Sequence, residues 1–260
     1  MSRTSFLFLL LLLFLAVSCT RRTPGVELEL NDGAGRAVAF WEISADEGPV
    51  FLDSVRLDKQ GHGQVYVPKN GEGMYALQSG KGQQNLLVLF LPQSPAAPLS
   101  LQADFDNLVP SARIASPRDT LAQTALLYQQ MLLEAQDEIH KTENLWAENR
   151  YLVRNVDSLY EACVQNINTM QETIRTVAQE LCTENTHNLL PVFMVNKQLA
   201  GKDLFDMESG QDIAFLLDCA QRMQEQQPDN AHVRRFLTTL RRAQANQRQR
   251  TLNSDTNAKP

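Results

Sequence analysis

The chain has 260 residues, of which 43% are apolar and 21% are charged, a composition typical of a globular protein long enough for two domains. Its 24 basic and 30 acidic residues give a formal net charge of −6, which argues against a dedicated nucleic-acid-binding protein with a basic face. Ten of the twelve glycines lie between Gly25 and Gly82, and eight of the eleven prolines lie at or before Pro117. Because glycine and proline mark turns and weaken helices, the two halves of the chain should fold differently.

Residues 1–18 have the pattern of a signal peptide. One positive charge precedes the apolar run Phe6–Val17, whose twelve residues are too few for a membrane-spanning helix of about 20 residues. The run ends in Leu-Ala-Val-Ser-Cys, which resembles a bacterial lipobox, with Ala16 where the pattern prefers Leu. The resemblance implies cleavage after Ser18 and acylation of Cys19.

This resemblance also implies a location. Several acyl chains on Cys19 would anchor the protein stably, with residues 19–24 as a lipidated tether. Thr20 follows the cysteine where an inner-membrane retention signal would have Asp, which implies an outer-membrane lipoprotein. Residues 20–23 contain no acidic cluster, and we therefore expect the protein to face the periplasm. The alternative is an ordinary secretory signal that leaves Cys19 as a free thiol.

Residues 25–115 predict a β domain. Short alternating runs are separated by turn residues, as at Asn31-Asp32-Gly33, and they suggest an antiparallel β-sandwich or barrel. The expected strands cover 26–30, 38–43, 50–57, 64–67, 75–77, 86–91 and 99–105. Leu86–Leu91 is apolar throughout, which predicts a central strand covered on both faces.

Three of these segments also carry a family resemblance. Phe51–Leu57, Gly61–Val67 and Met74–Leu77 follow one another in an order that resembles the β domain of unknown function that precedes the thioredoxin domain in envelope thiol–disulfide oxidoreductase lipoproteins. The resemblance covers residues 25–118 and implies that helices follow the β domain. It also implies a thioredoxin domain, but the chain contains no Cys-x-x-Cys motif.

Residues 116–247 predict a helical domain, so the expected fold class is α+β. Ser116–Asp119 is a typical helix start, and no glycine or proline occurs from Arg118 to Leu190. Two stripes with four–three spacing predict a long hairpin that turns near residues 144–149, with a single helix as the alternative. The stripes are Leu121, Ala125, Tyr128, Leu132, Ala135 and Ile139, then Leu152, Val156, Leu159, Cys163, Ile167, Met170, Ile174, Val177 and Leu181.

Shorter helices should follow the hairpin. One is expected from Pro191 to Gly201, and others after Gly210 and after Pro228. Residues 248–260 are polar and predict a disordered tail.

Three cysteines besides Cys19 could carry redox chemistry. On one helix Cys163 and Cys182 would be roughly 28 Å apart, too far for a disulfide. Cys163 lies on the apolar stripe and is expected to be a core residue, which leaves Cys182–Cys219 as the one pairing to consider.

Other candidate residues favour structural roles. Two carboxylate–histidine pairs have the three-residue spacing of the metal ligands in di-iron helical bundles. Such a site also needs inward-facing carboxylates on two further helices, and the sequence does not indicate them. Packing or solvated surface positions are expected for the remaining candidates. These residues are Asp137 and His140, Glu184 and His187, His62, Asp53 and Ser54, Trp41 and Trp146, and the pairs Arg234–Arg235 and Arg241–Arg242. We therefore expect no catalytic, cofactor or metal site.

Three functions remain after this reading. The favoured one is a non-enzymatic, lipid-anchored envelope protein that binds a protein partner, or itself, through the helical hairpin. The second is an accessory or remnant of a thiol–disulfide redox system that uses Cys163, Cys182 or Cys219. The third is a small-ligand or glycan binder that uses the β domain.

Overall fold

A computed structural model describes residues 23–68, 73–92, 97–115, 119–152 and 154–257 and confirms the α+β class. The leader, Cys19 and the expected helix start at 116–118 lie outside these residues. No helix in the described ranges has the length and apolar character needed to cross a membrane. The strands are β1 Thr23–Asn31, β2 Ala37–Ser44, β3 Gly48–Arg56, β4 His62–Val67, β5 Met74–Gln78, β6 Leu86–Phe90, β7 Leu99–Asp104 and β8 Arg113–Ile114.

The strands form two open four-stranded sheets. Sheet A has the order β4-β1-β7-β8 and sheet B the order β3-β2-β5-β6. The sheets are not closed, so the barrel alternative is wrong. One neighbour pair, β1 with β7, is parallel, with Leu28 opposite Leu101, whereas antiparallel pairing was expected throughout. Strands β5 and β6 belong to sheet B, and the chain then crosses back to sheet A, where β7 pairs with β1. Because this connection crosses between the sheets, β7 can run parallel to β1.

The facing sides of the two sheets share one apolar core. Alternation along β1 places Val26, Leu28 and Leu30 inward, where sheet B presents Phe40 and Tyr75. The last two rings stack with their centroids 5.3 Å apart. The short helix α2 (Leu108–Ser111) and the start of the first long helix cover one end of this core.

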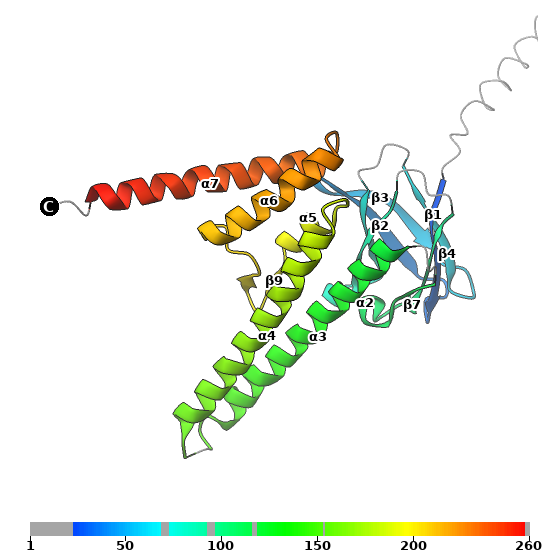
Figure 1. Cartoon of the computed structure of the whole chain (residues 1–260). Helices are drawn as coiled ribbons and strands as arrows, with labels where there is room; N and C mark the ends of the chain where they lie inside the picture. The colour runs from blue at the N-terminus through cyan, green and yellow to red at the C-terminus, as the bar shows by residue number, and fades with distance from the viewer. Residues whose placement is uncertain (1–22, 69–72, 93–96, 116–118, 153, 258–260) are drawn as a thin grey trace, which may run out of the picture.

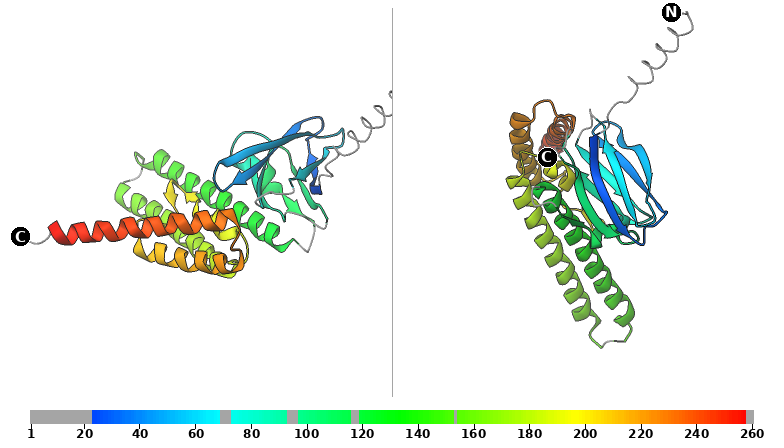
Figure 2. Two further views of the ribbon diagram at one scale, coloured as in Figure 1. Left: turned by 90° about the horizontal axis from the view of Figure 1, so that it is seen from above. Right: turned by 90° about the vertical axis from the view of Figure 1, so that its right-hand side faces the viewer.

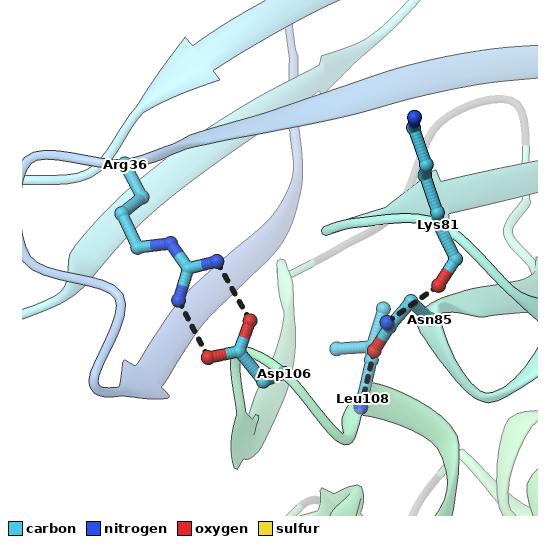
Figure 3. A network of polar contacts seen from close by, with 5 residues as sticks. All are labelled: Arg36, Lys81, Asn85, Asp106 and Leu108. Carbon is cyan, nitrogen blue, oxygen red and sulfur yellow. Dashed lines mark hydrogen bonds and ion pairs between the residues drawn. The ribbon is translucent and has the colours of Figure 1, made fainter.

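Polar contacts fasten the sheets together at the end nearest α2 (Figure 3). Arg36, which precedes β2, donates two hydrogen bonds of 2.6 and 2.7 Å to Asp106, which follows β7. The same guanidinium lies 3.7 Å from the centroid of the Phe105 ring. Buried Asn85 donates to the Lys81 carbonyl and accepts a hydrogen bond from the Leu108 amide. These contacts join the segments that enter or leave the two sheets.

The second half of the chain is helical. Its helices are α3 Thr120–Asn149, α4 Val156–Glu184, α5 Leu190–Val195, α6 Gly210–Gln226 and α7 Ala231–Asn257. Helices α3 and α4 lie side by side as a hairpin (Figure 1). The turn lies at residues 150–155, later than expected, because Leu145, Trp146 and their neighbours continue α3. Asp119 is the N-cap of α3 rather than a residue of its first turn.

A second core joins the helices to the outer face of sheet B. Met74, Ala76, Val88 and Phe90 point away from sheet A and belong to one core cluster with residues of all five helices from α3 to α7. Figure 2 shows the resulting layers, with the helices on one side of the sheets. This core cluster therefore combines sheet residues from before residue 115 with helix residues from after it.

Strand β6 is covered on both faces, as its apolar run indicates, but it is an edge strand and not a central one. Its free edge is occupied by the side chain of Gln129 from α3. The Gln129 amide accepts a 2.8 Å hydrogen bond from the Val88 N–H and donates a 2.9 Å hydrogen bond to the Val88 carbonyl. A side-chain amide thus supplies the pairing that a further strand would have provided.

Two expectations for the C-terminal part are wrong. Helix α5 ends at Val195, and a short hairpin of β9 (Gln198–Leu199) and β10 (Lys202–Asp203) follows. Ala200 and Gly201 have φ of 52° and 73°, the left-handed pair that a tight hairpin turn requires. Helix α7 continues to Asn257, through most of the segment that was expected to be disordered.

Candidate functional site

The three cysteines of the described chain are buried free thiols. Cys163 and Cys182 lie on α4, and Cys219 lies on α6. Cys182 and Cys219 belong to the same core cluster, yet they form no disulfide. Burial raises the pKa of both thiols, and the neighbouring Cys219 raises that of Cys182 further. The thiols are therefore protonated at neutral pH, whereas redox chemistry uses the thiolate.

The carboxylate–histidine pairs do not converge. The exposed His140 side chain lies 3.9 Å from Glu143 on the same helix. His187 is exposed after the end of α4, with its Nε2 3.3 Å from the Asn188 amide. Among the residues that the structure describes, no three His, Cys, Asp or Glu side chains are grouped as metal ligands.

The polar residues of the expected strand ends and turns have local partners. Asp53 accepts a 2.8 Å hydrogen bond from the amide of Ser54. The carboxylate of Asp58 accepts hydrogen bonds from the amides of Gln60 and His62, and the bond from His62 is the largest cause of its lowered pKa. These contacts stabilise the backbone. His62 is exposed, as expected, but it is the first residue of β4 and not a loop residue.

Two other candidates, Trp41 and Arg235, have structural contacts. Trp41 is partly buried against the helix-side core, and its ring lies edge-on to Phe51 at 5.2 Å. Arg235 of α7 reaches Asp46 in the turn between β2 and β3, with a separation of 3.2 Å. This ion pair connects the last helix to sheet B.

Two hollows lie on and beside sheet A. One, of about 500 Å³, is lined by Glu27, Glu29, Asp58 and His62 among others, and the other, of about 730 Å³, borders Arg113. The described residues that line them include no Phe, Tyr or Trp. Glycan sites depend on aromatic stacking and ligand pockets on apolar walls, so these hollows do not favour the third function.

A cluster of exposed apolar side chains lies at the end of the α3–α4 hairpin. We call Leu145, Tyr151, Leu152 and Tyr160 the hairpin tip; their exposures are 51%, 81%, 80% and 54%. Trp146 packs against Tyr160 with ring centroids 5.3 Å apart. Figures 1 and 2 show the hairpin extending beyond the sheets, so the tip is open to solvent.

The geometry of the turn explains why the sequence did not reveal this cluster. Leu152 fits the inward stripe by spacing, but it precedes α4 and lies in the turn, where helical periodicity no longer applies. Asn155 caps α4 by accepting a 3.2 Å hydrogen bond from the Ser158 amide. An asparagine three residues before a serine, with Asp157 in the first turn, is the signal that could have located this helix start.

Comparison with protein-family models, with curated proteins and with solved structures finds no match. The resemblance to the β domain of thiol–disulfide oxidoreductase lipoproteins therefore stays a prediction. The fold and the surfaces described above are the basis for assigning a function.

Proposed function

We propose that the protein is a lipid-anchored, non-enzymatic lipoprotein of the bacterial outer membrane that faces the periplasm and binds a protein partner through the hairpin tip. The observation that carries the proposal is the grouping of Leu145, Tyr151, Leu152 and Tyr160 at the end of a projecting hairpin. Water-exposed apolar groups of this size are costly unless a partner covers them, and aromatic side chains dominate protein interfaces.

The position of the tip agrees with attachment through Cys19. The leader precedes β1, and β1 lies on the opposite side of the molecule from the hairpin tip in both views (Figures 1 and 2). An anchor at Cys19 would leave the tip directed away from the lipid surface, where a soluble or membrane-bound partner can reach it.

Site-specific photocrosslinking in intact cells tests the binding surface. A photoreactive residue at position 152 should give one reproducible adduct, and a matched probe at Tyr66, which is exposed on sheet A, should not. The mass of the adduct distinguishes a different protein from a second copy of this chain. Equal adducts at both positions, or none at position 152, would contradict the proposal.

The anchor is tested independently of the partner. The wild-type protein should remain with the membrane fraction and carry acyl chains at Cys19 by mass spectrometry, while Cys19→Ser should become soluble or retain its leader. A mature wild-type chain without acyl groups would support the ordinary secretory signal instead.

A further inference from the structure

A cavity of about 290 Å³ lies where the free edge of β6, helix α3 and the segment after α5 meet. Leu86 and Val88 contribute the strand side, Leu132 and Leu133 the helix side, and Lys197 the segment after α5. Its size is close to the lower end of small-molecule sites, about 300 Å³. The cavity is remote from the hairpin tip, and it shares Val88 and Gln129 with the contact at the edge of β6.

Among the described residues that line this cavity, Lys197 is the only titratable side chain. Its ammonium nitrogen lies 4.0 Å from the centroid of the Phe193 ring, which holds the charge by a cation–π contact. Arg36, Arg175 and Arg235 each have a carboxylate partner, but no described Asp or Glu forms an ion pair with Lys197. Burial without a compensating acid lowers the pKa of Lys197 from 10.5 to about 8.

The walls around this amine combine aliphatic side chains with the amide side chains of Gln83, Gln129, Gln136, Asn196 and Gln198. Leu86, Val88, Leu132 and Leu133 provide aliphatic surface beside the charge. Gln129, which also lines the cavity, is fixed by its hydrogen bonds to Val88 and by a further one of 3.0 Å to the Ala125 carbonyl. A wall residue that is already held in place, as Gln129 is, costs little reorganisation when a ligand enters.

We propose that this cavity binds a small aliphatic carboxylate, with the carboxylate paired to the Lys197 ammonium and the aliphatic chain against the leucines of α3 and Leu86. Such a ligand supplies the missing negative charge and covers apolar surface at the same time. An alcohol of equal length lacks the charge, and an amine of equal length places a second cation beside the first.

Octanoate, 1-octanol and octylamine are the probes, titrated separately into the mature protein by calorimetry at pH 7.5. Octanoate should bind roughly tenfold or more tightly than 1-octanol, and octylamine should not bind. Because pairing with a carboxylate raises the pKa of Lys197, the protein should take up protons when octanoate binds near pH 8. The heat of binding should then depend on the ionisation enthalpy of the buffer.

Three variants separate the cavity from the protein surface. Lys197→Met should abolish the preference for octanoate over 1-octanol, and Gln136→Trp, at an exposed position of the lining, should block both by filling the entrance. Lys202→Met removes an exposed lysine from the neighbouring hairpin and should leave octanoate binding unchanged. A preference for octanoate over 1-octanol that survives Lys197→Met, or octanoate binding that is lost equally in Lys202→Met, would overturn the proposal.

Discussion

At the scale of single residues, burial decides what the titratable groups can do. Cys182 and Cys219 are fully buried, and their thiol pKa values are raised for that reason. Lys197 is partly buried without an acidic partner, which lowers its pKa to about 8. The same physical cause, loss of hydration of the charged form, suppresses thiolate chemistry at one place and leaves an uncompensated cation at another.

The cysteines provide the first prediction. Iodoacetamide at pH 8 should leave Cys163, Cys182 and Cys219 unmodified in the native protein and modify all three in urea, because native thiols are buried and two have raised pKa values. Peptide mass spectrometry measures the modified fraction. Rapid native labelling of Cys182 or Cys219 would favour the redox function.

Lys197 provides a prediction about pH. The unfolded chain binds a proton at this lysine up to about pH 10.5, and the folded protein only up to about pH 8, so the free energy of unfolding should rise between these values. Lys197→Met should lack this rise and should stabilise the protein at pH 7 by roughly 1–2 kcal/mol, after allowance for partial exposure. Urea unfolding at a series of pH values measures both effects, and Lys202→Met, at an exposed lysine, is the control.

At the scale of elements, a side chain of α3 covers the free edge of strand β6. Gln129 replaces a neighbouring strand by bonding to both polar backbone groups of Val88. The hairpin of α3 and α4 buries Ile139 and Cys163 along its length but ends in exposed Tyr151 and Leu152. Within the described residues, the hairpin therefore ends in an exposed apolar cluster, the hairpin tip.

Gln129→Met should destabilise the protein by about 1–3 kcal/mol, because it leaves the buried N–H and C=O of Val88 unpaired at similar side-chain volume. The exposed strand edge should also promote association at high concentration. Chemical denaturation and light scattering measure the two effects. Gln136→Met, seven residues further along α3 at an exposed position, should change neither stability nor association. An equal loss of stability in both variants would mean that the edge contact is unimportant.

At the scale of the whole molecule, the two cores share sheet B. Tyr75, Leu77, Leu87 and Leu89 face sheet A, while alternate residues such as Phe90 face the helices. The Phe90 ring packs edge-on to Phe193 of α5 at 5.7 Å. Loss of either layer would uncover one face of the sheet, so the sheets and helices should unfold together.

Phe90→Ala should therefore cost about 3–5 kcal/mol and should lower the midpoint of strand and helix unfolding alike. Calorimetry should show one transition in both proteins, with circular dichroism and tryptophan fluorescence giving the same midpoint. Phe51→Ala, at an exposed ring of β3, is the matched control and should cost at most about 1 kcal/mol. Two separated transitions would mean that sheets and helices are independent domains.

The sequence by itself determined the local elements. Alternation along residues 26–30 predicts β1 because only one face of a strand meets a core, and Val26, Leu28 and Leu30 are all buried. Four–three spacing along 121–139 predicts the inner face of α3 for the same reason, and its Ala125, Tyr128 and Ile139 are buried. Both patterns repeat within a few residues of one chain segment, so they can be read without knowing what packs against it.

Tertiary structure alone decided how these elements meet. The parallel pairing of β1 with β7, the position of β6 at an edge, and the contact of Gln129 with Val88 each join residues far apart in the chain. The exposure of Leu152 and the burial of Lys197 likewise depend on which elements lie nearby. No spacing rule encodes such contacts, because the free energy of a buried charge or an exposed leucine is set by neighbours that only the folded chain brings together.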